Sequence, residues 1–275
     1  MKNIVVGLGT FPYKQELENV LPKALGLGYS FVDTSDDYEN EEFVGKYINN
    51  KQLKIFSKFS YVHLINNFEN HFNASKKKLE ANGGHLSCYL MHWPYPFLYK
   101  KIWSKMEELY LSGKVDEIGV CNFTCKHLMK LMKSCRVKPM YNEIEVHPLF
   151  QQRDTVEFCQ NNGIKVISYS PFARIDKRLF ENEVLKEIAK REETSIANII
   201  LKWNIEKKCI PIPSTSKEKH LLDMSINNLD KIELTDDDIK HVDNLECNGR
   251  IRYNPDTYFS FKTKVKFFLM SLSVR

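Results

Sequence analysis

The sequence predicts an α/β fold, a single-domain (β/α)8 TIM barrel, from three observations. Eight short apolar segments alternate with helical segments, and this alternation is typical of parallel strands joined by helical crossovers. The length of 275 residues suits one barrel, since such barrels run to about 250 residues as a single domain. After the first strand the chain has Gly7-Leu8-Gly9 without a third glycine, so an open sheet with a Rossmann nucleotide site is not expected.

The expected strands are short apolar runs that end at polar residues, glycine or proline. The run from 86 to 93 is almost continuously apolar, which is typical of a strand covered on both faces. The strands are predicted at 4–6, followed by a glycine turn at 7–11, and at 31–33, 54–58, 86–93, 117–123, 140–148, 165–171 and 209–213. Helices are predicted at 16–27, 40–49, 67–81, 102–111, 124–135, 155–161, 183–191, 195–207, 217–225 and 236–245.

Composition and charge limit the classes of function. Hydrophobic residues make up 43% and charged residues 27%, which is ordinary for a globular protein. The net charge of +5 comes from dispersed lysines, so we expect no nucleic-acid partner, although anionic small molecules would be compatible. Seven scattered cysteines without a C-x-x-C pair suggest neither a disulfide framework nor a zinc site, and favour the cytoplasm. No membrane span is expected.

Four polar residues follow expected strands at the end of a barrel where active sites lie. Asp33 and Tyr38 follow the second strand, Lys58 ends the third, and His92 lies at the end of the fourth. Adjacent strands lie about 4.8 Å apart, so these side chains can meet around one point. A nearby ammonium lowers the pKa of a phenol, so Lys58, held by Asp33, would make Tyr38 a better proton donor. A neutral His92 would hydrogen-bond a substrate oxygen.

Each of these residues also has an ordinary structural interpretation. A tyrosine in an acidic loop is commonly a surface aromatic, a lysine at a strand end a solvated charge, and a histidine before Trp93-Pro94 a core residue. Their joint position at successive strand ends favours a site that protonates a carbonyl oxygen while another group attacks the carbon. His147 also lies at a strand end, but no partner is evident, and we expect it to be structural. A metal-dependent hydrolase would need clustered ligands, and the chain has no His-x-His pair, so no metal is expected.

Short motifs that include these four residues, and others like them, recur along the whole chain. They are Gly7-Leu8-Gly9-Thr10, Asp33-Thr34 through Tyr38-Glu39-Asn40-Glu41, Ser57-Lys58, Met91-His92-Trp93-Pro94, Gly113-Lys114-Val115, 118–123, 142–148, Tyr169-Ser170-Pro171 and Leu201-Lys202-Trp203. In order and spacing they resemble the aldo-keto reductase family over nearly the whole chain. The resemblance implies a barrel that binds a nicotinamide cofactor in extended form without a Rossmann motif.

The resemblance also implies roles for individual residues. The catalytic tetrad would be Asp33, Tyr38, Lys58 and His92, with hydride from the nicotinamide ring reaching the carbonyl carbon while Tyr38 protonates the oxygen. The ring would stack on Tyr169. The cofactor-contacting residues implied are Cys121, Asn122, Glu143, Tyr169, Ser170, Pro171, Ser214, Thr215, Lys217 and His220.

Two implied nicotinamide contacts depart from the usual family pattern. Cys121 stands where the family commonly has serine, and Glu143 where it commonly has glutamine. An ionised glutamate accepts a hydrogen bond from the carboxamide but cannot donate one, so binding of the ring is expected to be weaker.

The residues expected at the 2′-phosphate of the cofactor depart further from the usual family pattern. Ser214 and His220 replace a lysine and an arginine that contact the 2′-phosphate of NADPH, and Met224 stands where an asparagine is common. Losing two cations weakens the preference for NADPH over NADH. Lys217 and Lys219 are close enough in sequence to substitute, so we expect NADPH, with NADH possible.

The substrate pocket and the C-terminal tail complete the expectations. Phe11, Trp93 and Phe97 would form an apolar, aromatic substrate pocket. Residues 248–256 resemble the family's C-terminal segment, so the tail, residues 246–275, is expected to fold over the barrel mouth or to fray. Residues 262–275 mix lysines with apolar side chains, which suits packing on the barrel, fraying or a membrane-surface helix.

The expected function is therefore an NAD(P)H-dependent oxidoreductase, a monomer that reduces the aldehyde or ketone group of a small molecule to an alcohol. The alternative is a cofactor-binding regulatory barrel with little or no turnover, which the altered cofactor positions suggest. The complete tetrad counts against that alternative.

Overall fold

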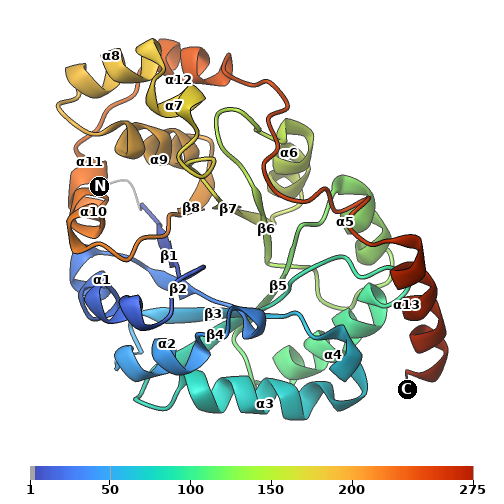
Figure 1. The fold of residues 1–275 in the computed structure, drawn as a ribbon. Helices are drawn as coiled ribbons and strands as arrows, with labels where there is room; N and C mark the ends of the chain where they lie inside the picture. Colours follow the sequence, from blue (N-terminus) through green and yellow to red (C-terminus); the bar gives the residue numbers. More distant parts are fainter. Residues whose placement is uncertain (1–3, 50, 275) are drawn as a thin grey trace.

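The computed structural model describes residues 4–49 and 51–274, which form one parallel barrel with helices around it (Figure 1). Each strand pairs in parallel with the next along the chain. The ring closes where the backbone N–H of Gly9 donates to the carbonyl of Pro213 at 2.9 Å. The strands are β1 (Gly7–Gly9), β2 (Phe31–Asp33), β3 (Lys54–Phe59), β4 (His85–Met91), β5 (Glu117–Cys121), β6 (Tyr141–Glu145), β7 (Lys165–Tyr169) and β8 (Cys209–Ile212). The predicted (β/α)8 fold is confirmed.

Helices cover the outside of the barrel. The short 3-10 helices are η1 (Gln15–Asn19), η2 (Leu25–Leu27), η3 (Asp36–Tyr38) and η4 (Val62–Asn67). The α-helices are α1 (Leu21–Ala24), α2 (Glu41–Tyr47), α3 (Phe68–Leu79), α4 (Tyr99–Leu111), α5 (Cys125–Met132), α6 (Arg153–Asn161), α7 (Lys177–Phe180), α8 (Glu183–Arg191), α9 (Ile196–Glu206), α10 (Glu218–Asp223), α11 (Ile226–Asp230), α12 (Asp236–Asp243) and α13 (Phe261–Ser273).

The barrel interior is filled below its mouth. The rings of Phe31 and Phe56 stack with centroids 4.2 Å apart, and Tyr141 meets Phe56 edge-on at 5.2 Å. Cys88, Leu90, Cys121, Ile167 and Ile212 belong to the same buried cluster. This plug closes the lower barrel, so any chemistry must take place at the carboxyl ends of the strands.

The prediction for the first strand and the turn after it was wrong. Residues 4–6 are not a strand, and the glycines expected to form a turn are themselves β1. Glycine is needed because β1 lies close to its neighbours: a Cβ on Gly7 would lie 2.4 Å from the Phe31 ring.

The helix predicted at 16–27 is also broken, into η1, α1 and η2. Pro22, in the first turn of α1, has no N–H to continue a helix that comes from η1, but it is well suited to start a new one.

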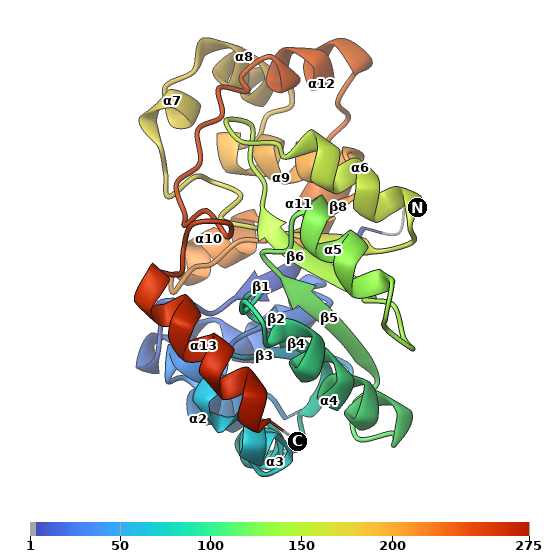
Figure 2. The same ribbon diagram turned by 90° about the vertical axis from the view of Figure 1, so that its right-hand side faces the viewer.

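The described part of the C-terminal tail, residues 246–274, follows α12, passes the barrel mouth and ends in α13 on the outside of the barrel (Figure 2). The Lys101 side chain of α4 donates to the carbonyls of Ser271 and Val274, and Phe267 packs against Tyr95 with centroids 5.9 Å apart. The tail helix therefore packs on the barrel. No helix of the described residues is long and apolar enough to cross a membrane.

Candidate active site

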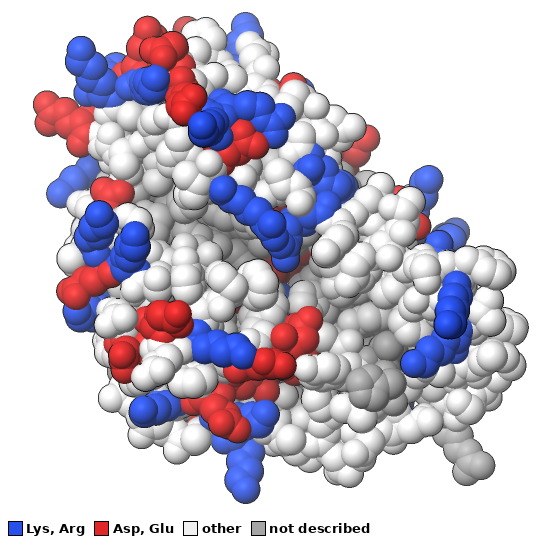
Figure 3. Space-filling model, in the orientation of Figure 1, with Lys and Arg blue, Asp and Glu red and all other residues white. Residues whose placement is uncertain are grey.

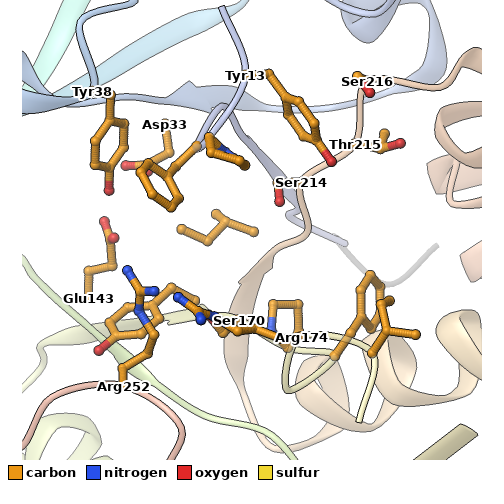
Figure 4. Close-up of a pocket in the computed structure, with 18 of the residues that line it drawn as sticks. Tyr13, Asp33, Tyr38, Glu143, Ser170, Arg174, Ser214, Thr215, Ser216 and Arg252 are labelled. Atoms are coloured by element: carbon orange, nitrogen blue, oxygen red, sulfur yellow. The ribbon is translucent and has the colours of Figure 1, made fainter. Parts of the chain in front are cut away.

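A cavity of about 530 Å³ opens at the carboxyl ends of the strands (Figure 4). Figure 3 shows the mouth as a hollow with lysine and arginine side chains beside it. Loops after six strands and the C-terminal tail line it. The lining residues that the sequence analysis singled out are Phe11, Asp33, Tyr38, His92, Trp93, Asn122, Glu143, Tyr169, Ser170, Pro171, Ser214, Thr215, Lys217 and His220.

Lys58 lies directly beneath the cavity and is fully buried. Its Nζ donates to both carboxylate oxygens of Asp33 at 2.6 Å and to the carbonyl of Thr34 at 3.0 Å. The same Nζ lies 3.3 Å from Oε1 of Glu143. Burial lowers the pKa of the ammonium, but the two carboxylates raise it well above its ordinary value, so Lys58 stays charged.

Tyr38 ends η3 directly after β2, and its ring lies over this charge. Lys58 Nζ lies 5.2 Å from the ring centroid. Burial raises the pKa of Tyr38 well above its ordinary value, Lys58 acts in the opposite direction, and Asp33 and Glu143 reinforce the rise. The expectation that Lys58 brings the pKa below its ordinary value was therefore wrong. The reason is that burial of the phenol has the largest effect on its pKa, and Asp33 and Glu143 add to the rise that the single ammonium opposes.

His92 follows β4, with its ring centroid 5.9 Å from that of Tyr38. Its Nδ1 lies 2.6 Å from Oγ of Ser60, 3.2 Å from Oγ of Ser35 and 3.4 Å from a carboxylate oxygen of Asp37. The Ser60 hydroxyl can donate to Nδ1, which leaves the ring proton on Nε2. In that tautomer His92 can donate a hydrogen bond to an oxygen in the cavity.

Asn122 ties the neighbouring strand ends together. It has a left-handed backbone, its Nδ2 donates to the carbonyl of His92 at 3.0 Å, and its Oδ1 accepts from the Tyr169 hydroxyl at 2.7 Å. The amide keeps one N–H and one lone pair for a ligand. Asn122 thus fixes the histidine and the aromatic ring that lie on either side of it.

Glu143 lies on β6 and points toward Tyr38 (Figure 4). Only 3% of the residue is exposed, and Oε2 has no hydrogen-bond partner among the described residues. Burial and the Asp33 carboxylate, opposed by Lys58, raise the pKa of Glu143 to about 8. The raised pKa favours the carboxylic acid form of this side chain, which can donate as well as accept a hydrogen bond.

The far end of the cavity is polar and basic. Residues 214–217 follow β8 and lie there together with His220. The buried Thr215 hydroxyl accepts from the backbone N–H of Lys217 at 3.0 Å, which fixes the turn. Of the two lysines considered from sequence, only Lys217 lines the cavity.

Lys58 lies beneath the cavity, and Lys219 and Met224 do not line it; nor do Cys121, an expected cofactor contact, and Phe97, an expected substrate contact. Cys121 is buried in the plug below it. Phe97 is 56% exposed on the outside, where its ring packs against Phe268 of α13 with centroids 5.4 Å apart.

Sequence reasoning missed two cavity cations, Arg174 after β7 and Arg252 in the tail. Arg252 lies in the segment expected over the mouth, and that position was the available signal. The sequence offered no signal for Arg174, because its place at the cavity depends on a left-handed backbone at residues 173–175.

His147, expected to be structural, is fully buried outside the cavity, with Nε2 3.0 Å from Oε1 of Glu145. Among the described residues, no group of three or more His, Cys, Asp or Glu could hold a metal ion.

Comparisons with known proteins identify the family. The model of the aldo/keto reductase family matches residues 3–246. A glyoxal reductase of Bacillus subtilis (strain 168) is 33% identical over 256 residues, 91% of each chain. A methylglyoxal reductase of Escherichia coli (strain K12) is 31% identical over 262 residues, 92% of this chain and 93% of that one.

Solved structures agree with the family match. An aldo-keto reductase from a Medee basin deep-sea metagenome library has a TM-score of 0.86 at 29% identity, covering 93% of this chain and 96% of that one. A Gox0644 mutant in complex with NADPH has a TM-score of 0.85 at 29% identity, covering 93% and 94%. This chain belongs to the aldo/keto reductase family and is an oxidoreductase.

Proposed function

We propose that this protein reduces the aldehyde or ketone group of a small molecule to an alcohol, with NADPH as the hydride donor. One observation carries the proposal: Tyr38 lines the cavity between His92 and the buried Lys58–Asp33 ion pair. A phenol in this position can protonate an oxygen that His92 holds.

The cavity residues fit the cofactor. Tyr169 offers a ring face, and Asn122 and Glu143 offer the hydrogen-bonding groups that a carboxamide needs, including the unpartnered Oε2. Lys217 at the other end, and Arg174 between the two ends, can pair with phosphate. When bound, the cofactor supplies hydride to the carbonyl carbon.

The chain's own residues handle the proton. The raised pKa of Tyr38 keeps the phenol protonated at neutral pH. His92 hydrogen-bonds the carbonyl oxygen and orients it, so that negative charge developing there meets two donors. Once Tyr38 has given up its proton, the nearby Lys58 ammonium stabilises the phenolate.

Glu143 acts in its protonated form. A neutral carboxylic acid donates and accepts hydrogen bonds, as a glutamine amide does, whereas a carboxylate only accepts. The raised pKa therefore offsets much of the difference between Glu143 and the family's usual glutamine.

The substrate class follows the relatives. Their names indicate glyoxal and methylglyoxal, which are small dicarbonyl compounds. Phe11 and Trp93 give this chain an apolar wall beside Tyr38. We propose a monomer, and we place it in the cytoplasm because all seven cysteines are free and suit a reducing compartment. The tail, residues 246–275, belongs to the barrel as one unit.

The test is a titration of purified protein with NADPH, followed by nicotinamide absorbance after addition of an aldehyde panel that includes methylglyoxal. Oxidation of NADPH that depends on the aldehyde supports the proposal. Tight binding of NADPH without turnover on any aldehyde would instead favour the regulatory barrel.

A further inference from the structure

The tail places a positive charge on the substrate side of the cavity. Arg252 lines the cavity, and its guanidinium carbon lies 5.7 Å from the centroid of the Phe11 ring. That ring lies 5.0 Å from the Tyr38 ring. Arg252 therefore projects over the same wall that faces the proton donor.

The position of Arg252 is fixed by its backbone. The N–H groups of Ile251 and Arg252 donate to the two carboxylate oxygens of Glu145, at 2.7 and 2.9 Å. Glu145 is 1% exposed at the end of β6, and His147 contacts one of the same oxygens. A buried carboxylate thus clamps the tail to the barrel at the residue that reaches into the cavity.

The guanidinium itself has no acidic partner. Within the described residues no carboxylate lies within 4.0 Å of it and no acceptor is assigned to its N–H groups, while Glu145 is occupied by backbone donors. Phe11 leaves the N–H edge of the guanidinium unsatisfied. A half-buried arginine with free donors at a cavity wall offers charge-assisted hydrogen bonds to an anion.

The place of Arg252 in the cavity separates it from the phosphate end. Figure 4 shows it beside Glu143, across the cavity from Ser214, Thr215 and Ser216. Arg174 extends into the cavity from the loop after β7, between these two ends. Lys217, at the end with Ser214, Thr215 and Ser216, would hold phosphate there, so Arg252 at the opposite end would remain available to another anion.

We infer that Arg252 is a specificity-determining residue that binds the carboxylate of a substrate which carries both an aldehyde or ketone and an acid group. The inference rests on the proposed function and specifies its substrate class as short oxo acids. The carbonyl oxygen lies between Tyr38 and His92, and the carboxylate lies under the guanidinium, next to the ring of Phe11.

The experiment compares two substrates that differ only in charge, 4-oxobutanoate and its methyl ester. Steady-state kcat/KM is measured with saturating NADPH for the natural protein, Arg252→Gln, Arg252→Lys and the control Arg250→Gln. Arg250 is a matched control from the same tail, since its guanidinium lies over the Phe150 ring at 4.2 Å and does not line the cavity. The Kd for NADPH and the thermal midpoint are measured for every variant.

For Arg252→Gln we expect kcat/KM for the acid to fall about ten- to hundredfold, the typical effect of losing a charge-assisted hydrogen bond, with the ester nearly unchanged. Arg252→Lys should recover part of the loss, and Arg250→Gln should behave like the natural protein. An equal loss on both substrates, an unchanged preference, or a rise in the Kd for NADPH that accounts for the loss would overturn the inference.

A binding measurement separates this inference from the proposed function. Calorimetric titration with butanoate, which has the carboxylate but no carbonyl, should show binding that Arg252→Gln weakens and that butanamide does not reproduce. If the natural protein reduces the ester without any preference for the acid and does not bind butanoate, the inference fails and the proposed function stands. If it reduces neither substrate, nor any aldehyde of the panel, the proposed function fails and butanoate binding decides the anion site alone.

Discussion

Replacing Glu143 by glutamine removes one ionisable group from the wall of the cavity and changes little else in shape. The carboxyl group lies 3.3 Å from Lys58 and close to Asp33, and its Oε2 is buried without a partner. Burial and Asp33 raise its pKa from 4.5 to about 8. Between these two values the folded protein holds a proton that the unfolded chain has released.

The sign and size of the effect on stability follow from this difference in bound protons. Because the folded state binds the extra proton, the free energy of unfolding falls as pH rises through this window, by about 1.4 kcal/mol per pH unit. Between pH 6 and 8 the natural protein should lose roughly 2 kcal/mol more than Glu143→Gln, and above pH 8 the difference should level off. Urea unfolding at pH 6, 7, 8 and 9 measures this directly.

The catalytic activity should depend on the protonation of the same Glu143 carboxyl group. Ionised Glu143 places a second negative charge against Lys58 and opposes the negative charge that develops on the carbonyl oxygen. For the natural protein, kcat/KM should fall above pH 8, by up to about tenfold per pH unit if only the protonated form works. Glu143→Gln should retain its activity over that range. Superimposable profiles of stability and activity for the two proteins would refute this reasoning.

Three further changes test other parts of the structure. Lys58→Met should destabilise the fold by about 3–5 kcal/mol at pH 7 in urea unfolding, because it leaves the buried Asp33 carboxylate without its ion-pair partner; an unchanged midpoint would contradict the ion pair. Lys217→Gln should raise the Kd for NADPH about fivefold or more, with little effect on NADH, in fluorescence titrations; equal effects on both cofactors would place this residue away from the 2′-phosphate. Gly45→Ala should lower the free energy of unfolding by roughly 1–3 kcal/mol in urea unfolding, because the added Cβ would lie 1.9 Å from a backbone carbonyl oxygen of α3. The control Gly26→Ala adds a Cβ in open space and should leave the free energy of unfolding unchanged.

Strand order and barrel closure could be predicted because they depend on periodicity along the chain. The eight apolar runs and the helices between them are local patterns, and parallel pairing follows from the connections. The two errors near the N-terminus depend on contacts between distant segments or on backbone hydrogen bonding. The strand at Gly7 lies so close to the Phe31 ring that only a residue without a side chain fits there. Pro22 divides a helix that hydrophobic spacing alone predicts as continuous.

The position of the tetrad could also be predicted, since strand ends converge in a barrel, and the structure brings Asp33, Tyr38, Lys58 and His92 together. The direction of the Tyr38 pKa shift could not be predicted. It depends on how deeply the phenol is buried and on the second carboxylate, Glu143, beside the same ammonium. The burial of the phenol and the charges around it are set by neighbouring residues from several strands, which a single stretch of sequence does not reveal.

The cations at the cavity could be found only in part. Lys217 follows β8 closely, so its position was indicated by the turn after that strand. Arg252 reaches the cavity because Glu145, more than a hundred residues earlier, holds the backbone of the tail. A hydrogen bond between residues so far apart in the chain cannot be recognised from the residues around either one in a single sequence.

Tyr38→Phe, with NADPH binding and carbonyl reduction measured on the same samples, tests the proposed reaction most directly. We expect the Kd for NADPH to stay close to that of the natural protein, while kcat/KM for methylglyoxal falls by about 10²–10⁴ because the proton donor is gone. An undiminished rate in Tyr38→Phe would contradict the role assigned to the phenol, and a natural protein that binds NADPH but reduces no aldehyde would contradict the reaction itself.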